Sequence, residues 1–498
     1  MKKLLILLIA LLISGCAGFE QSKNTIENGA YIKHAESGEK LTEGILVNGK
    51  IEGVVTSWYE NGQKRAEEPH RKGLKEGLAL YWHESGQKEA ELIYENDNVE
   101  GVGKTWYQNG KLQSEEQFKN GLKHGLSLFW HENGQKKAEL TYEHDQKIGL
   151  SRTWHDNGQK EAELSFEDNE AVGIAETWYE NGVQQSEEVY KDGLTEGLSR
   201  YWHENGHKKA EIRFVAGEKH GLSKTFFESG NKEAQGSYKN GKLEGLVTTW
   251  YETGGKQHEE FYHNGLLHGV NRVWHENGNK KFEQHYVSNV LQGLKTEWNE
   301  NGKKIIEFSY DKGQRVGLAE SWYGNGQKKG EFTYVKGKVQ GLVKIWYETG
   351  KKKSEEFYLD DLAHGPSIHW YQNGHKKAEG SLKKGKIEGL IASWYENGRK
   401  KSEEHYVGDL QQGRTTIWYE TGRKKSEELY EKGQKHSLSR YWYESGQKLA
   451  EIFYKNGEIH GIATAWYENG RKKEETEYVA GTRFGPIKKW DDMGLRTQ

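Results

Sequence analysis

The chain has 498 residues, of which 62 are Gly, three are Pro and one is Cys. Because 72 Lys and Arg nearly balance 75 Asp and Glu, net charge gives no attraction for nucleic acid, and a single Cys excludes an intramolecular disulfide framework and a Cys-rich zinc or iron–sulfur site. A 30% share of charged residues is typical of disorder, but 18 Trp and 28 Tyr favour a folded chain.

The first 16 residues, MKKLLILLIALLISGC, predict an export leader. Two lysines precede an apolar run of about ten residues, which is too short for a spanning helix of about 20 residues. The ending Ile13-Ser14-Gly15-Cys16 resembles the bacterial lipobox. That resemblance implies a signal peptide over residues 1–15, and a Cys16 carrying acyl chains such as palmitate at the mature N-terminus. Multiple chains make anchorage stable. The alternative is an ordinary secreted protein with a chance Cys.

Tryptophans recur every 24 residues after this segment. They begin at Trp58, Trp82, Trp106 and Trp130 and continue to Trp490, and Phe226 fills the one doubled gap. We therefore predict nineteen units in one array over residues 45–498, closed by a C-terminal cap. Residues 16–44 are predicted to hold the lipidated N-terminus, a linker and a degenerate repeat with His34 in the Trp position.

Three glycine positions mark each repeat. A Gly lies four residues after every Trp, beginning with Gly62, Gly86, Gly110 and Gly134, and predicts a hairpin turn. Nine residues before the Trp, thirteen units have Gly and six have an Asp or Asn, which tolerate the left-handed region. Those six are Asp97, Asp145, Asn169, Asn289, Asp361 and Asp409. A third Gly lies five before the Trp, fails only at Ser437, and predicts a bulge.

Two short stretches per repeat, such as residues 126–131 and 136–142, alternate in a pattern typical of antiparallel strands. Proline is scarce because interior strands need their amide donors. The predicted fold is all-β: an elongated, twisted antiparallel ribbon of about nineteen 24-residue hairpins, in which the recurring Trp and Gly residues are structural.

The hairpin register has two possibilities. A two-residue Asn–Gly turn would place the Trp opposite the Lys seven positions later. A three-residue turn with a glycine bulge would align it with the small residue and Tyr of the second strand. We favour the second register, because it collects Trp, Leu, Ala or Ser, and Tyr on one face and buries more apolar surface.

The repeat Gly-Leu-x-x-x-Trp-Tyr-Glu-Asn-Gly-Gln-Lys-Lys-Ala-Glu, followed by a Tyr and a Lys-Asn-Gly-like turn, resembles the MORN-repeat variant of bacteria over residues 45–494. The resemblance implies a twisted ribbon of hairpins that acts as a scaffold, a dimerisation platform or a membrane-associated binding surface. Many bacterial chains with this variant are labelled antitoxins of toxin–antitoxin systems. The resemblance supplies no catalytic residues.

Motifs that look catalytic coincide with repeat positions. The stretch His203-Glu204-Asn205-Gly206-His207 has the letters of a zinc-protease helix but falls on a predicted hairpin turn. Residues 101–105, Gly-Val-Gly-Lys-Thr, approach a P-loop but lack its following helix. Histidines at equivalent positions of successive repeats lie about 10 Å apart, too far to converge on a metal. We therefore predict no enzyme, no metal and no cofactor.

The aromatic ladder has a functional alternative. Regularly spaced rings can stack on sugars or on choline, as in cell-wall-binding repeats. The most plausible candidates are the tyrosines that follow the Trp, such as Tyr59, Tyr347 and Tyr467. The competing interpretation is that most rings form the core of a thin ribbon.

The resulting hypothesis is a non-enzymatic, lipid-anchored protein of the bacterial cell envelope that serves as a protein-binding scaffold. We expect the N-terminal lipid to anchor the protein in a membrane, and the presence of Ala17 after Cys16 favours the outer membrane over the inner membrane. One rival is a module that binds cell-wall glycan, and another is an immunity-type protein that neutralises a toxin. No nucleic acid is expected as a partner.

Overall fold

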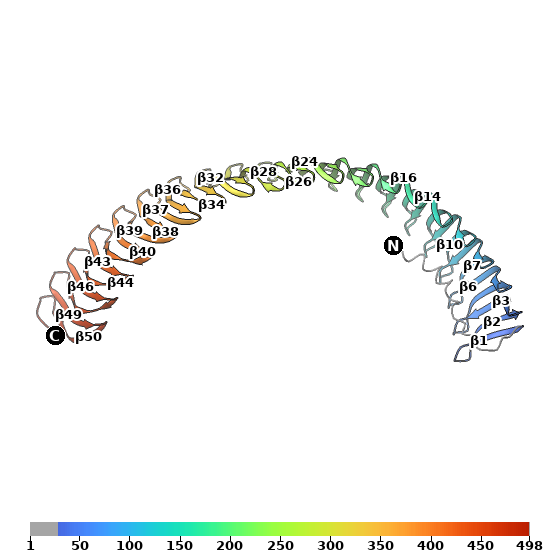
Figure 1. The fold of residues 1–498 in the computed structure, drawn as a ribbon, viewed down its shortest axis with the longest axis horizontal. Helices are drawn as coiled ribbons and strands as arrows, with labels where there is room; N and C mark the ends of the chain where they lie inside the picture. The colour runs from blue at the N-terminus through green and yellow to red at the C-terminus, as the bar shows by residue number, and fades with distance from the viewer. Residues whose placement is uncertain (1–27, 498) are drawn as a thin grey trace. The chain divides into compact units, whose positions relative to one another are not determined.

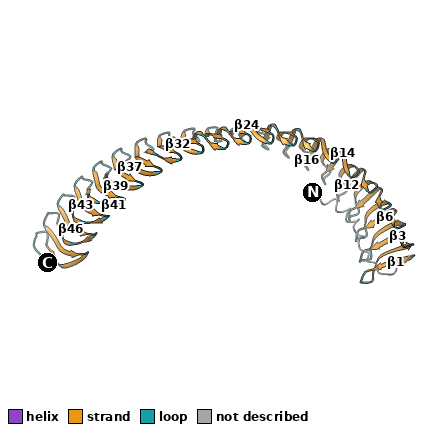
Figure 2. Ribbon diagram, in the orientation of Figure 1, coloured by secondary structure: helices purple, strands orange, loops and turns teal. Residues whose placement is uncertain are grey.

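The computed structural model of the protein describes residues 28–497. The chain forms two compact units, Met1–Gly230 (unit 1) and Asn231–Gln498 (unit 2). Within each unit, hairpins follow one another in chain order (Figure 1). Strands and connecting loops make up the described residues (Figure 2). The predicted all-β antiparallel fold of hairpin repeats is confirmed.

Unit 1 contains the following strands: β1 (Gly29–His34), β2 (Lys40–Val47), β3 (Lys50–Trp58), β4 (Lys64–Arg71), β5 (Leu74–Lys75), β6 (Gly77–Trp82), β7 (Lys88–Glu95), β8 (Asn98–Val99), β9 (Gly101–Trp106), β10 (Leu112–Lys119), β11 (Leu122–Lys123), β12 (Gly125–Trp130), β13 (Lys136–Glu143), β14 (Gln146–Trp154), β15 (Lys160–Glu167), β16 (Glu170–Trp178), β17 (Gln184–Lys191), β18 (Leu194–Thr195), β19 (Gly197–Trp202), β20 (Lys208–Val215), β21 (Glu218–Lys219) and β22 (Gly221–Phe226).

Unit 2 contains the following strands: β23 (Lys232–Lys239), β24 (Lys242–Trp250), β25 (Lys256–His263), β26 (Leu266–Leu267), β27 (Gly269–Trp274), β28 (Lys280–Val287), β29 (Val290–Leu291), β30 (Gly293–Trp298), β31 (Lys304–Asp311), β32 (Gln314–Trp322), β33 (Lys328–Val335), β34 (Lys338–Val339), β35 (Gly341–Trp346), β36 (Lys352–Leu359), β37 (Leu362–Trp370), β38 (Lys376–Lys383), β39 (Lys386–Trp394), β40 (Lys400–Val407), β41 (Leu410–Gln411), β42 (Gly413–Trp418), β43 (Lys424–Glu431), β44 (Gln434–Lys435), β45 (Ser437–Trp442), β46 (Lys448–Lys455), β47 (Glu458–Ile459), β48 (Gly461–Trp466), β49 (Lys472–Val479) and β50 (Thr482–Lys489).

The turn after each Trp has three residues, as favoured from the sequence. In the β3–β4 hairpin, the Tyr59 amide donates to the Gln63 carbonyl and the Gly62 amide donates to the Tyr59 carbonyl. Gly62 has φ +82°, a left-handed value that a residue with a Cβ adopts at a cost. The turn glycine is therefore required by the backbone.

The predicted arrangement of faces is right for the Trp and the Leu but wrong for the small residue and the Tyr. Trp58 pairs with Lys64 and Ser57 pairs with Ala66, which leaves Arg65 as an additional, bulged residue. Because one extra residue changes which side chains share a face, Trp and the Leu four residues before it lie on one side of the sheet, which we call the tryptophan face. The small residue and the Tyr of the second strand lie on the other side, which we call the small-residue face.

The second turn of each repeat has two residues, and both adopt positive φ. Between β2 and β3, Val47 pairs with Lys50, while Asn48 and Gly49 have φ +53° and +72°. This geometry is that of a type I′ hairpin. The six Asp and Asn residues predicted to replace glycine here have φ between 66° and 73°. Their left-handed conformation is confirmed.

The glycine five before the Trp starts a wide bulge, as predicted. Ile45 pairs with Glu52 and Glu43 pairs with Thr56, so three residues of β3 oppose one residue of β2. The prolines lie close to this bulge: Val54 pairs with Pro69, Pro366 pairs with Ser381, and Pro486 is in the same repeat position as Pro366. Pro69 and Pro366 therefore occupy one kind of cross-strand pair, which tolerates the loss of an amide donor.

The core follows the small-residue face. Ala79 and Ala90 are fully buried, and Tyr81, Leu92 and Tyr94 pack around them. Ser127, Ser199 and Ser439 take the place of Ala79 in later repeats and are also fully buried. Larger side chains, Val55 and Val343, are buried at the same position in other repeats.

Ser437 predicts a stabilising substitution. It has φ +65° at the position where the other repeats have glycine. We expect Ser437→Gly to raise the free energy of unfolding by about 1 kcal/mol, since the left-handed conformation strains a residue with a Cβ. Thermal melting measures the change. The matched control is Gly461→Ser, because a Cβ at Gly461 meets no atom within 4 Å. The backbone explanation would be contradicted if both substitutions changed the free energy of unfolding in the same direction and by the same amount.

Candidate binding surfaces of the repeats

The tryptophan rings are half-buried, and a lysine of the preceding hairpin covers most of them. The Nζ atoms of Lys40, Lys64 and Lys88 lie 5.4, 5.2 and 5.1 Å from the ring centres of Trp58, Trp82 and Trp106. These are cation–π distances. Trp130 lacks such a lysine, because Leu112 occupies the corresponding position.

The same lysines bind glutamates. Lys64 pairs with Glu67 and Lys88 pairs with Glu91. Each lysine thus links a carboxylate of its own hairpin to the indole of the next hairpin. The tryptophans consequently have a structural role that joins neighbouring repeats.

The three candidate tyrosines also join neighbouring repeats. The hydroxyls of Tyr59, Tyr347 and Tyr467 donate to the carbonyl oxygens of the Trp residues 23 positions later, at 2.8, 2.8 and 3.0 Å. Burial, followed by the nearby Glu89, raises the pKa of Tyr59, so the donor proton is retained at neutral pH. The phenol therefore serves as a tether between hairpins.

The rings of these tyrosines are partly covered as well. Arg65 lies 6.0 Å from the centre of the Tyr59 ring, Lys353 lies 5.7 Å from that of Tyr347, and Lys473 lies 5.3 Å from that of Tyr467. One ring face is thereby occupied by a cation of the same chain. Stacking on a sugar stays a prediction, and it would use the ring face opposite the cation.

Histidines one residue after the Trp make the same hydrogen bond to the next repeat as the tyrosines. The Nε2 atoms of His83, His131 and His155 lie 2.8 to 2.9 Å from the carbonyl oxygens of Trp106, Trp154 and Trp178. Most repeats have either His or Tyr at this position, because both rings present a polar hydrogen at the required reach. In His203 to His207, the amide of His203 donates to the His207 carbonyl, which confirms a hairpin turn.

An exposed aliphatic side chain lies four residues before most tryptophans. We call this set the outer aliphatic row. On the tryptophan face its exposed members are Val54, Leu78, Val102, Leu126, Leu150, Ile174 and Leu222 in unit 1, and Leu246, Leu294, Leu318, Leu342, Leu390, Leu438 and Ile462 in unit 2. Ile174 is 60% exposed and Leu126 is 44% exposed. The row thus presents one exposed apolar side chain in most repeats of each unit.

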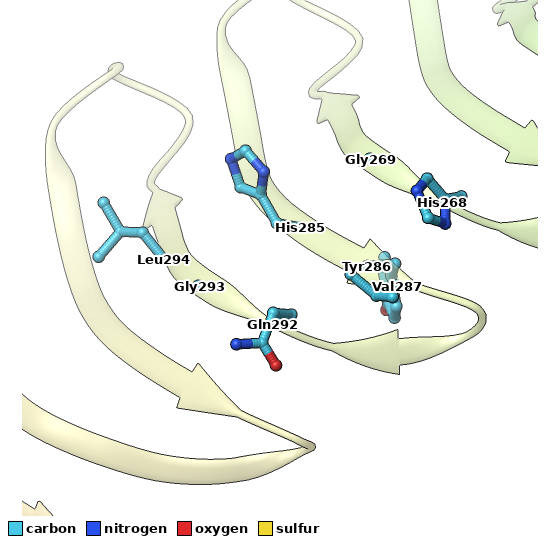
Figure 3. A pocket seen from close by; sticks show the side chains of 8 residues that line it. All are labelled: His268, Gly269, His285, Tyr286, Val287, Gln292, Gly293 and Leu294. Atoms are coloured by element: carbon cyan, nitrogen blue, oxygen red, sulfur yellow. The ribbon is translucent and has the colours of Figure 1, made fainter.

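Two hollows lie between neighbouring hairpins. One in unit 2, of about 360 Å³, is lined by His268, His285, Gln292 and Leu294 with glycines between them (Figure 3). The other, in unit 1, has a volume of about 500 Å³ and opens on the small-residue face beside Glu188 and Tyr201. The first is an open trough over two bulge glycines, whereas the second is bordered by a carboxylate and aromatic rings.

Neither a metal site nor a spanning helix is found in residues 28–497. No group of three or more His, Cys, Asp or Glu side chains in this range is arranged to hold a metal ion. No helix of this range is long and apolar enough to cross a membrane. Cys16 and the leader lie outside the described residues, so lipidation stays a prediction.

The last hairpin predicts a pH effect. Hydrogen bonding from Lys472, and then from Lys488, lowers the pKa of Glu475 to about 2 from 4.5. A lowered carboxyl pKa stabilises the fold above pH 4.5, and the stability is lost as the pH falls towards 2. We expect the hydrogen-exchange protection factors of β49 and β50, which correct for the intrinsic exchange rate, to fall over that interval. Glu475→Gln should remove this pH dependence, and an unchanged profile would contradict the assignment.

Sequence reasoning missed the outer aliphatic row and the tethers. The row is visible as Leu, Ile or Val at 24-residue spacing, but the register favoured from the sequence predicts that these residues lie with the Trp on the buried face. The tethers are signalled by the alternation of Tyr with His, two residue types that share little except a ring and a polar hydrogen. A residue that recurs as either type indicates a hydrogen-bond donor.

Comparison with known proteins places the repeats in a family. The family model described as the MORN repeat variant matches residues 51–72, 75–96, 99–120, 123–144, 171–192, 219–240, 267–288, 315–336, 339–360, 435–456 and 459–480. No curated protein matches the chain.

Among solved structures, a crystal structure of TcdB2-TccC3-Cdc42 aligns with 93% of this chain at 8% identity and a TM-score of 0.14. A structure of the Photorhabdus luminescens Tc holotoxin pore aligns with 94% at 7% identity and a TM-score of 0.13. This chain spans 30% of the matched chain in both. The segments that the family model matches coincide with the 24-residue hairpin repeats of the structure. The chain is a repeat scaffold that belongs to the MORN repeat variant family.

Proposed function

We propose that the protein is a non-enzymatic scaffold of the bacterial cell envelope, anchored by lipid at Cys16, which binds a protein partner along the outer aliphatic row. The observation that carries the proposal is the row itself. It repeats an exposed apolar side chain at every second strand, about 10 Å apart within each unit. An isolated exposed Leu needs no explanation, but a regular row does.

The charges beside the row favour a protein over a charged polymer. On the tryptophan face, Lys64 pairs with Glu67 and Lys136 pairs with Glu139, so each repeat presents both signs together. A surface with balanced charge gives no electrostatic attraction for an anionic polymer. An apolar strip with a polar rim is typical of protein–protein interfaces.

The repeat geometry also favours binding over catalysis. Active sites bring unlike residues together at one place, whereas each position here recurs with the same partners in repeat after repeat. Tyr59, Tyr347 and Tyr467, for example, make the same bond in three different repeats. Repetition multiplies contact area along an extended partner.

Capture from solubilised envelopes tests the proposal. The lipidated protein is crosslinked in cells and purified beside a variant carrying Leu78→Glu, Leu126→Glu and Ile174→Glu. The matched control carries Glu60→Lys, Glu132→Lys and Glu180→Lys on exposed turns. We expect a stoichiometric protein that the row variant loses and the turn variant keeps. Equal capture by both variants would contradict binding through the row.

Binding of cell-wall glycan is the second candidate, and one observation favours it. Tyr179, Tyr201 and Trp202 line the 500 Å³ cavity of unit 1, where a sugar ring could stack. The test is whether soluble wall sugars quench Trp fluorescence and release the protein from wall material. Quenching that persists in the row variant would support glycan binding and remove the need for a protein partner.

A further inference from the structure

A buried or half-buried carboxylate recurs ten residues after the Trp on the small-residue face, and in three repeats the chain supplies its own cation. Lys75 pairs with Glu68, Lys123 pairs with Glu116, and Lys435 pairs with Glu428. These lysines occupy the same repeat position, seven residues before the next Trp. The glutamate and the lysine therefore form a repeated pair.

In these repeats the lysine also lies against aromatic rings. The Lys123 Nζ is 5.8 Å from the centre of the Phe129 ring and 5.3 Å from that of Tyr142. The Lys435 Nζ is 5.4 Å from the centres of both Tyr441 and Tyr454. Each of these two ammoniums is thus held by one carboxylate and two rings, and that of Lys75 lies 5.0 Å from the centre of one ring, Tyr94. The arrangement suits an alkylammonium group.

The repeat of Glu188 keeps the carboxylate and the rings but not the lysine. Tyr201 and Phe214 occupy the positions of the two rings, and Thr195 stands where the other repeats have Lys. Thr195 pairs with Tyr190 in the same register in which Lys435 pairs with Tyr430. The backbone is therefore unchanged, and only the cation is missing.

Glu188 lies beside space for a ligand. The carboxylate accepts a hydrogen bond of 2.8 Å from the Tyr190 hydroxyl. The 500 Å³ cavity is lined by Glu188 and Tyr201, together with Ser186, Ala210 and Ile212. Burial, followed by the charge of Glu188, raises the pKa of Tyr201 to about 12, so the phenol stays neutral beside the carboxylate.

Other repeats without the lysine fill the place differently. Gln411 donates to Glu404, Asn271 donates to Glu260, and the His369 Nε2 lies 3.5 Å from Glu356. Among the described residues of its hairpin, Glu188 has neither an ion pair nor an amide donor of this kind; its side-chain donors are the hydroxyls of Tyr190 and Tyr201. It therefore differs from its equivalents in lacking a nitrogen donor.

We propose that Glu188 and Tyr201, which line the cavity, form a site for a primary alkylammonium group, supplied by a lysine side chain of the protein partner. The identity of the supplier rests on the proposed function, whereas the chemistry of the site rests on the three repeats that bind their own lysine. Lys209 lines the mouth of the cavity and is exposed. Its charge opposes an incoming cation, so its removal strengthens binding.

Titration of the full chain with Nα-acetyl-lysine methylamide, followed by ligand-observed NMR, tests the site. We expect saturable binding that is about tenfold weaker in Glu188→Gln, since a charge-assisted hydrogen bond is lost. Lys209→Ala should tighten binding. The neutral probe, acetylated on its side-chain nitrogen, should not bind. Equal binding of the charged and neutral probes would overturn the proposal.

Thr195→Lys provides the sharpest variant. The introduced lysine should fill the site as Lys75, Lys123 and Lys435 do, abolish binding of the probe and raise the melting temperature. Retained binding in this stable variant would overturn the site. The capture experiment separately decides the supplier: if the row captures a partner and Thr195→Lys does not weaken that capture, the partner's lysine is excluded. If no protein is captured, the proposed function is contradicted. The site at Glu188 is then still tested by the titration with the probe.

Discussion

Replacing Lys123 by Met is expected to lower the free energy of unfolding of unit 1 by about 3 kcal/mol, because a buried carboxylate loses its only ion-pair partner among the described residues. The Glu116 side chain is 5% exposed and Lys123 is 25% exposed. Water therefore cannot replace the ammonium around Glu116. Chemical denaturation followed by far-UV circular dichroism measures the loss.

The matched control removes both charges. Glu116→Leu combined with Lys123→Met should recover most of the lost stability, because an apolar pair does not have to be desolvated. Leu is compatible with this position, since Leu140 occupies it in the following repeat. If the double variant is less stable than Lys123→Met, the pair stabilises the fold through the packing of its side chains. That result would contradict the electrostatic explanation.

Replacing Trp82 by Ala is expected to cost about 2 kcal/mol, less than a fully buried Trp because the ring is half exposed. The substitution removes the indole that Lys64 covers at 5.2 Å. It also opens a gap between two hairpins. The same denaturation measurement applies, and hydrogen exchange should locate the loss in β4, β6 and β7.

Trp82→Phe is the control that the chain itself offers, since Phe226 occupies the Trp position of one repeat. Phe keeps a ring for the lysine and most of the apolar area, so a cost of about 1 kcal/mol is expected. If Trp82→Phe were as damaging as Trp82→Ala, the indole N–H would be essential, and packing against Lys64 would not explain the recurrence of Trp.

The sequence was sufficient to predict turns and strands because these depend on local chemistry. Gly62, Asp97 and Asn289 adopt the left-handed conformations expected of their residue types. The faces depend on pairing across a hairpin, where one bulged residue such as Arg65 reverses the outcome. Periodicity alone does not reveal such a bulge, because every repeat contains it and the 24-residue phase is preserved.

The candidate sites show the same limit. The sequence identifies Tyr59 as a candidate for stacking on a ligand, but its hydroxyl reaches the carbonyl of Trp82, 23 residues away, and only the stacking of hairpins brings the two together. The site at Glu188 is visible in the sequence only after the structure shows that Lys75 and Glu68 meet. With that contact known, Thr195 becomes recognisable as the departure that leaves the carboxylate without a nitrogen donor.

The most direct test of the binding surface is site-specific photocrosslinking in living cells. A benzophenone amino acid is placed at Leu78, Leu126 or Ile174 in the outer aliphatic row, and at Glu132 on an exposed turn of the same unit. The account predicts that all three row positions crosslink to one envelope protein in a stoichiometric adduct and that the turn position does not. Adducts from the turn position alone, or none from the row, would contradict it.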